Sequence, residues 1–397
     1  MTDFGAKGLS LAAYGKGVKN VSDTVRVGII GAGGRVRGLA ALLTGQNPNI
    51  EVTALFDPLD RSVTAARELF GDTVAVYSTY RELLEKSDVD WVMIGSWNSH
   101  HRDQIVDSLG AGKHVFTEKP LAISLDQCRD IAIAYAGSGR LFTIGFTLRY
   151  SPHYRKIKEI VDSGVVGEVM SLEFNETLSF NHGGYIMGDW RRLTANAGTH
   201  LLEKCCHDVD IINGLVGSRV RRAASFGGID FFTPENEHHI ARIGKDATGR
   251  DAYRTWPGSV GLNPFTSDKD IVDNQVAILE FDSGVRATFH TNCNMAIPER
   301  RIYLGGTEGT LRADLIAGRI EYQRIGFDTE LVDASTEARG GHGNGDPVLC
   351  AHLATMMTEG AESLTTLEDG INSAVVCFGI DRAMETGTVY DLTTLWD

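Results

Sequence analysis

The chain has 397 residues, enough for two domains with separate hydrophobic cores. Its net charge of −14 argues against nucleic acid or an anionic membrane surface as a partner, because both attract basic patches. No stretch approaches about 18 apolar residues, as a membrane-spanning helix requires, and the six cysteines form no CxxC pair typical of zinc sites. We therefore expect a cytoplasmic protein with reduced thiols and no bound metal.

Residues 1–24 are predicted to form an N-terminal arm. From residue 25 to about 147, short apolar runs alternate with segments whose apolar residues recur every three or four positions. Such runs are typical of strands covered on both faces, and the segments between them are typical of amphipathic helices. The strand candidates are 25–30, 51–56, 74–77, 91–96, 114–117 and 141–146. This rhythm predicts an α/β domain over 25–147 with a doubly wound parallel sheet.

The rhythm changes over 148–397, where helices are predicted at 151–164 and about 199–216, with a long strand at 167–180 between them. Later strand candidates contain the turn signals DSG and GGTEGT, which predict an open, largely antiparallel sheet. These strands are 219–228, 274–295, 299–314 and 318–324, and helices at 346–360 and 367–386 complete an α+β domain. The polar stretch 233–271 fits no regular element and is either a lid or subunit contact or a surface excursion.

The first predicted strand leads into a glycine-rich turn, GAGGRV, at residues 31–36. Gly31 allows a tight turn, and Gly33 lets backbone amides approach a pyrophosphate at the start of the next helix. Val36 stands where the dinucleotide fingerprint has its third glycine, which affects helix packing more than phosphate contact. The predicted cofactor contacts here are Gly31, Ala32, Gly33, Gly34, Arg35 and Val36.

A carboxylate ends the second predicted strand. Asp57, followed by Pro58, stands where it can accept hydrogen bonds from both hydroxyls of an adenine ribose. The same charge would repel a 2′-phosphate, so the sequence predicts NAD rather than NADP. Arg61 could pair with a phosphate or could be a solvated helix residue.

The strand candidate 114–117 ends in Glu118 and Lys119, followed by Pro120. An ion pair at a strand end contributes little stability once its desolvation is counted, so this placement suggests a site. Strand ends of this kind face the ligand crevice in a doubly wound sheet. Lys119 could there donate to an alcohol oxygen and stabilise its alkoxide character. Pro120 fixes the backbone and is compatible with a cis Lys119–Pro120 bond.

The segment THLLEKCCHDVD, 199–210, supplies the second half of the predicted site. Glu203 and His207 are four residues apart, so they share one face of a helix. Alcohol oxidation needs a group that takes the hydroxyl proton, and histidine suits that role near neutral pH. Cys205, Cys206 and His207 point about 100° apart on a helix, so they do not converge on a metal ion.

The order of the motifs GAGG, FDP, IGSWNSHH, AGKHVFTEKPLA and GTHLLEKCCHD resembles the glucose-fructose oxidoreductase, inositol dehydrogenase and MocA family over residues 25 to about 220. The resemblance implies a Rossmann domain, an α+β substrate domain, and homodimers or homotetramers formed through the open sheet. It places Lys119 beside the nicotinamide and the substrate hydroxyl, and Glu118 on the cofactor side. The family usually has Asp where this chain has Glu203. The residues implied on the nicotinamide-ribose side are Ser96, Trp97, Asn98 and His101, the last favoured over His100 by its spacing.

Several polar or aromatic residues near these motifs are candidates for substrate contact: Arg149, Tyr150, Trp190, Arg191 and His342. Trp190 could stack on a sugar or on the nicotinamide, or it could pack in a core. His342 lies in GHGNGD, which suits hydrogen bonds to a polyol or a helix cap after a glycine-rich loop.

The sequence thus predicts NAD-dependent oxidation of a secondary hydroxyl of a sugar, glycoside or cyclitol, or the reverse reduction. His207 would act as the base, Lys119 would polarise the hydroxyl, and Glu203 would support both. The alternatives are a glycosidase or a sugar–sugar oxidoreductase that retains its NAD, and a non-enzymatic sensor of sugar and NAD.

Overall fold

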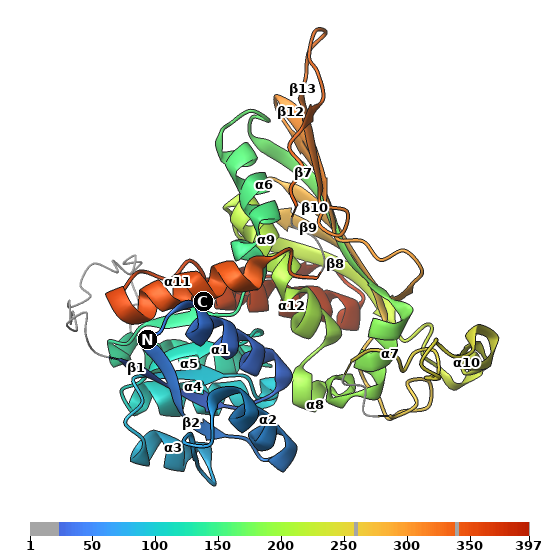
Figure 1. Cartoon of the computed structure of the whole chain (residues 1–397). Helices are drawn as coiled ribbons and strands as arrows, with labels where there is room; N and C mark the ends of the chain where they lie inside the picture. The colour runs from blue at the N-terminus through green and yellow to red at the C-terminus, as the bar shows by residue number, and fades with distance from the viewer. Residues whose placement is uncertain (1–23, 258–260, 338–340, 397) are drawn as a thin grey trace, which may run out of the picture.

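The computed structural model describes residues 24–257, 261–337 and 341–396, so the predicted N-terminal arm lies outside the described residues up to position 23. Two sheets organise the chain (Figure 1). None of the described helices combines the length and the apolar character needed to cross a membrane.

The first sheet is parallel throughout and has the strand order β3-β2-β1-β4-β5-β6. This confirms the predicted doubly wound Rossmann sheet. The chain adds β2 and β3 on one side of β1 and then crosses over to add β4, β5 and β6 on the other side. Ligands bind at the carboxyl ends of the strands at such a switch point. Its strands are β1 (Val25–Ile30), β2 (Ile50–Phe56), β3 (Ala75–Val76), β4 (Trp91–Ile94), β5 (His114–Thr117) and β6 (Phe142–Ile144).

The helices between these strands are α1 (Gly34–Gln46), α2 (Asp60–Phe70), α3 (Tyr80–Lys86), α4 (His101–Gly110) and α5 (Leu125–Ser138). Thr79 and Ser124 cap α3 and α5, because each side chain accepts a hydrogen bond from a backbone N–H in the first turn. The turn after β1 needs glycine at 31, where φ is +81° and a Cβ would lie 2.4 Å from the backbone nitrogen of Ser96.

The second sheet has nine strands in the order β14-β13-β12-β11-β7-β10-β9-β8-β15. Its pairs are antiparallel except for β10 and β7, which run parallel, so the sheet is mixed and the expectation of a largely antiparallel sheet is confirmed. Its strands are β7 (Val169–Ser179), β8 (Val220–Gly228), β9 (Asn274–Phe281), β10 (Arg286–Met295), β11 (Arg301–Gly306), β12 (Gly309–Asp314), β13 (Arg319–Arg324), β14 (Val332–Asp333) and β15 (Tyr390–Asp391).

The predicted helices of the second half are present as α6 (Pro152–Asp162), α9 (Cys206–Val216), α11 (Gly345–Glu359) and α12 (Leu367–Thr386). Helices α12 and α9 pack against the inner face of the nine-stranded sheet. The short helices α7 (Phe180–Gly188), α8 (Thr194–Ala197) and α10 (His238–Ile243) were not predicted from the sequence. Chain order also did not reveal that α11 returns to pack against α1, where Leu349, Leu353 and Met356 join the core of the Rossmann half.

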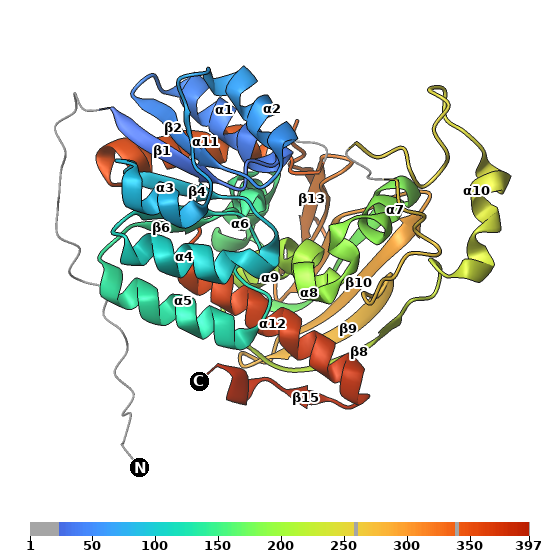
Figure 2. The ribbon, with the colours of Figure 1, turned by 90° about the horizontal axis from the view of Figure 1, so that it is seen from below.

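The polar stretch 233–271 is anchored by its own aromatic residues and by Phe232 just before it. Phe232, Tyr253 and Phe265 are buried, and their ring centroids lie 5.0–5.8 Å apart. Their cluster also includes Met187 of α7, which ties the stretch to the wall of the cavity described below. Helix α10 projects away from both sheets (Figure 2).

Candidate active site

A cavity of about 1680 Å³ lies where the carboxyl ends of β1, β2, β4 and β5 face the second half of the chain. Its lining includes Asp57, Lys119, Glu203 and His207, which come from both halves. The cavity is larger than the roughly 300–1000 Å³ typical of a single small-molecule site, so it has room for two ligands.

The glycine-rich turn opens the cavity toward the backbone. Gly31, Gly33 and Gly34 line it, and α1 begins at Gly34 with no acidic residue in its first turn. Backbone N–H groups at such a helix start attract phosphate. These residues fit a dinucleotide pyrophosphate.

Two residues predicted as cofactor contacts are not on the cavity surface. Ala32 and Val36 are fully buried, and a Cβ at Gly95 would lie 2.6 Å from the Val36 Cβ. Their side chains therefore do not reach a cofactor, and contact through their backbone groups stays a prediction. Val36 packs α1 against Gly95, which directly follows β4.

Asp57 lies in the cavity wall at the end of β2, with Pro58 and Arg61 beside it. One of its carboxylate oxygens accepts from the backbone N–H of Leu59 at 2.8 Å, which fixes the side chain at the strand end. The other oxygen carries no hydrogen bond among those assigned in the described residues. The position and chemistry fit an adenine ribose.

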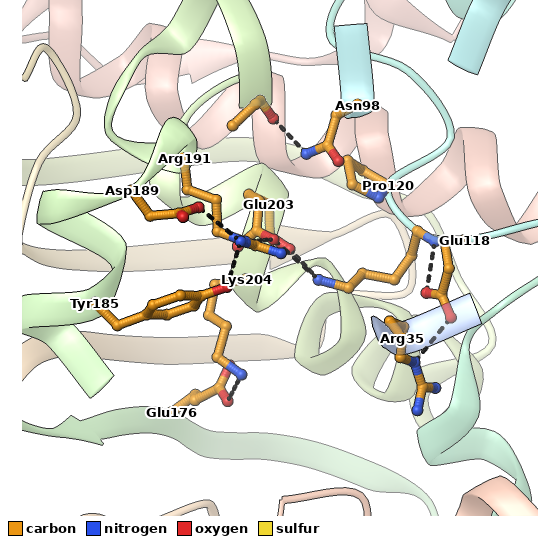
Figure 3. Close-up of polar contacts among 12 residues, drawn as sticks. Arg35, Asn98, Glu118, Pro120, Glu176, Tyr185, Asp189, Arg191, Glu203 and Lys204 are labelled. Atoms are coloured by element: carbon orange, nitrogen blue, oxygen red, sulfur yellow. Dashed lines mark hydrogen bonds and ion pairs between the residues drawn. The ribbon is translucent and has the colours of Figure 1, made fainter. Parts of the chain in front are cut away.

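Arg35 and Glu118 form an ion pair with each other (Figure 3). Arg35 Nε is 2.9 Å from Glu118 Oε1, and Arg35 Nη1 is 2.7 Å from Asp346 Oδ2. A third bond joins Arg35 Nη2 to Thr147 Oγ1 at 2.7 Å. This cluster ties α1 to the end of β5 and to the start of α11, and Arg35 and Glu118 still line the cavity.

Ser96, Trp97 and Asn98 follow β4 and line the cavity. Asn98 Nδ2 donates to the carbonyl oxygen of Ala197 at 2.8 Å, so the loop is fastened to α8 of the second half.

His101 does not line the cavity, and the expectation of direct cofactor contact is corrected. Its ring is fully buried, with Nδ1 2.8 Å from the Pro120 oxygen and Nε2 3.2 Å from the Ser96 oxygen. His100 lines the cavity instead. His101 is thus a positioning residue that joins the loop after β4 to the Lys119–Pro120 peptide, which is cis.

Lys119 reaches across to the second half of the chain. Its Nζ donates to the backbone oxygen of Glu203 at 2.5 Å and lies 3.6 Å from Glu203 Oε1. Burial is the largest single influence and opposes the charge, but Glu203, Cys206 and Glu118 together outweigh it and hold the pKa of Lys119 above its usual 10.5. Lys119 is therefore an ammonium group with N–H donors left for a ligand.

Glu203 lies in a π-helical turn, Leu201–Cys205, that leads into α9. Such turns contain one residue more than an α-helical turn and are frequent at functional sites. Glu203 Oε1 is 3.0 Å from Arg191 Nε, and Figure 3 shows Asp189 and Tyr185 around the same guanidinium. Burial would raise the pKa of Glu203, but the positive charges of Lys119, Arg191 and Lys204 together outweigh it and lower the pKa well below 4.5. Glu203 is thus a stable carboxylate and a poor proton acceptor.

His207 is buried at the cavity wall, with ring contacts to Phe146 and His342 at centroid distances of 5.8 Å. Burial, and then the charge of Lys119, lower its pKa well below 6.5. The imidazole is therefore neutral at pH 7. Its Nδ1 is buried and has no hydrogen-bond partner among the described residues.

Trp97 and Trp190 stack on each other across the two halves. Their ring centroids are 5.2 Å apart and their planes differ by 10°. The Arg191 guanidinium lies over Trp190, 4.3 Å from the ring centroid. The two tryptophans, predicted for cofactor and substrate separately, form one aromatic wall of the cavity.

Of the other predicted substrate residues, Arg191 and His342 line the cavity, whereas Arg149 and Tyr150 do not. Arg149 forms a bidentate pair with buried Asp210, with both N···O distances 2.7 Å. Tyr150 is buried, with its hydroxyl 3.3 Å from Thr365 Oγ1. Both residues hold the junction between the halves together, so the expectation of substrate contact is wrong for this pair.

Sequence reasoning missed several lining residues: Glu176, His182, Tyr185, Lys204 and Trp256. Lys204 directly follows Glu203, so its position in the motif could have predicted that it lies at the site. The others come from β7, α7 and the polar stretch, whose approach to the cavity depends on tertiary structure.

Residues 25–146 match an oxidoreductase family with an NAD-binding Rossmann fold, and residues 154–312 match the GFO/IDH/MocA C-terminal domain. The chain belongs to the GFO/IDH/MocA family. The predicted family is confirmed, and with it an NAD(P)-dependent dehydrogenase with NAD as its cofactor.

The chain is similar in sequence to other proteins over part of its length. It is 32% identical over 199 residues to an inositol 2-dehydrogenase of Ralstonia nicotianae, covering 49% of this chain and 55% of that protein. It is 25% identical over 308 residues to the 2,7-anhydro-N-acetylneuraminate hydratase of Escherichia coli, covering 77% of this chain and 72% of that protein.

Two solved structures share the fold. A levoglucosan dehydrogenase in complex with NADH and levoglucosan matches with a TM-score of 0.76 and 16% identity, covering 94% of this chain and all of that chain. A myo-inositol 2-dehydrogenase of Lactobacillus plantarum matches with a TM-score of 0.72 and 18% identity, covering 93% of this chain and 99% of that chain.

Proposed function

We propose that this protein oxidises a secondary hydroxyl group of a sugar, a glycoside or a cyclitol with NAD, or carries out the reverse reduction. The observation that carries the proposal is that Lys119 and His207, from different halves, line one cavity beside the glycine-rich turn. Relatives with the names inositol 2-dehydrogenase and levoglucosan dehydrogenase support a ring-shaped polyol as the substrate.

The Rossmann half offers a place for each part of NAD. Gly31, Gly33 and Gly34 would hold the pyrophosphate, and Asp57 would hold the adenine ribose. Ser96 and Asn98, together with Glu118, would flank the nicotinamide ribose. When bound, NAD supplies the hydride acceptor for alcohol oxidation.

Side chains of the protein remove the proton of the reacting hydroxyl group. Lys119 donates a hydrogen bond to the alcohol oxygen and stabilises the negative charge that develops there. Neutral His207 accepts the hydroxyl proton. Glu203 keeps Lys119 charged and aimed, because its carboxylate and backbone oxygen both approach Nζ.

The direct test measures absorbance at 340 nm with NAD and a panel of cyclitols, aldoses and glycosides. Oxidation of at least one polyol, with NADH formed in equal amount, is the expected result. Product formed without lasting NADH would instead identify an enzyme that retains its NAD and returns the hydride. Binding of NAD and sugar without turnover of any panel member would contradict the proposal and favour a sensor.

A further inference from the structure

The cavity extends well beyond the groups that the proposed reaction uses. Figure 3 shows Glu176, Lys204 and Tyr185 on the side of Glu203 that is remote from Glu118 and Arg35. These residues and His182 line the same cavity. The region therefore lies past the reacting hydroxyl, on the side away from the cofactor.

The floor of this outer region is a fixed pair of opposite charges. Lys204 Nζ is 3.1 Å from Glu176 Oε1, and the buried Arg300 Nη2 is 3.1 Å from Glu176 Oε2. Arg300 is in turn held by Asp208 at 2.6 Å. An ammonium group has three donors, so Lys204 can still bind hydroxyl groups, whereas Glu176 is buried and holds Lys204 in place.

The wall of the outer region is aromatic. His182 of α7 and Trp256 of the polar stretch stack with their centroids 4.0 Å apart and their planes differing by 9°. Tyr185 lies beside them, 6.5 Å from the Trp256 centroid. The axial C–H groups on one face of a pyranose are apolar, so such a surface stabilises a sugar ring by dispersion and by burial of apolar area.

We infer that this outer region is a second sugar subsite, formed by Glu176, Lys204, His182 and Trp256, and that the substrate is a disaccharide or another glycoside. The inference rests on the proposed function for the ring that reacts. The reacting ring lies between Lys119, His207 and Arg191. The second ring lies against the aromatic stack, with its hydroxyl groups on the Lys204 ammonium that Glu176 holds in place.

The test measures binding by calorimetry to the NADH-loaded protein, so that it does not depend on turnover. Cellobiose, maltose, lactose and melibiose are each compared with D-glucose and D-galactose. At least one disaccharide is expected to bind about tenfold more tightly than either of its component sugars, as an aromatic contact of this size predicts.

Two substitutions assign that gain to the outer region. Trp256→Ala and Lys204→Met should each remove most of the disaccharide advantage, measured as the ratio of the two dissociation constants. His238→Ala, an exposed residue of the same stretch that does not line the cavity, is the matched control and should keep the ratio.

The inference is overturned if no disaccharide binds more tightly than its components, or if both substitutions leave the ratio unchanged. These outcomes are distinct from failure of the proposed function. A protein that oxidises single sugars without a disaccharide advantage would lack only the second subsite. Tight disaccharide binding with no oxidation would refute only the redox reaction.

Discussion

His207 and Lys119 have opposite protonation states although they share one cavity. The ammonium of Lys119 is preserved by Glu203, and that same positive charge helps to keep His207 neutral. An acid and a base held side by side in this way match the two roles that alcohol oxidation requires. The substitution of Glu for the family's usual Asp is compatible with this arrangement, because Glu203 contacts Lys119 and Arg191 rather than His207.

Replacing the histidine separates catalysis from cofactor binding. His207→Ala should lower kcat/KM for the preferred polyol by about 100-fold or more, the usual loss when a general base is removed. The dissociation constant of NAD, measured by fluorescence, should change less than about twofold, because His207 lies on the second half. His352→Ala, a histidine outside the cavity lining, serves as the control. Unchanged turnover in His207→Ala would remove this residue from the mechanism.

The pH profile follows from the same two groups. The active form needs neutral His207 and protonated Lys119. Activity should fall as pH drops through the His207 pKa, which lies well below 6.5, and as pH rises through the Lys119 pKa, which lies above 10.5. Initial rates of oxidation at saturating NAD should therefore show a plateau across neutral pH. An acid limb centred at or above pH 6.5 would contradict this assignment.

At the scale of secondary structure, the site depends on contacts between elements that are distant in the chain. Arg35 at the start of α1 binds Glu118 after β5 and Asp346 in the first turn of α11. Gly345 allows α11 to begin there, because a Cβ would lie 2.4 Å from the Thr147 oxygen. Helix α11 thus packs on the Rossmann half and, through Asp346, holds His342 at the cavity.

Removing the guanidinium should loosen this junction. Arg35→Met leaves the Glu118 and Asp346 carboxylates without their cation, a loss of about 2 kcal/mol for one buried and one partly buried charged partner. The melting temperature without NAD should fall by about 2 °C. Arg382→Met, which breaks an exposed pair with Glu385, should change it by less than about 1 °C. Adding Asp346→Asn to Arg35→Met should restore part of the loss, and no recovery would argue against unpaired charge as the cause.

At the scale of the whole molecule, the nine-stranded sheet has one covered face and one open face. Helices α9 and α12 pack on the inner face, whereas Phe226, Ile278 and Tyr303 are 70%, 60% and 53% exposed on the strands of the outer face. Ile278 of β9 is flanked by Ala224 of β8 and Thr288 of β10. Large apolar side chains left exposed on one face of a sheet often mark a protein interface.

We propose that this outer face joins two copies of the chain, as the family resemblance implied. The native protein should elute as a dimer or tetramer in size-exclusion chromatography with light scattering, and Ile278→Lys should shift it to a smaller species. Ile133→Lys, which changes an isolated apolar residue of α5 that is 74% exposed, should leave the assembly unchanged. A monomeric native protein would refute the interface.

Much of the fold could be predicted from the sequence because its signals are local. Alternating apolar runs and helical periodicities located the six parallel strands, and the GAGG turn and the EKP segment marked strand ends at the ligand crevice. Lys119, Glu203 and His207 were found for the same reason, since each lies in a short motif with a fixed spacing.

The tertiary structure decided what local signals could not express. Arg149 and Tyr150 were expected at a strand end but lie in a 3₁₀ turn after β6, where long-range partners turn them to the junction. His101 lies beside the cavity residues in sequence, but its ring faces backbone oxygens inside the protein. The Trp97–Trp190 wall and the Glu176–Lys204 floor join segments far apart in the chain. The sequence therefore determined which groups can perform the chemistry, whereas packing between the halves determined which of them reach the cavity, because side-chain direction depends on partners that only the folded chain supplies.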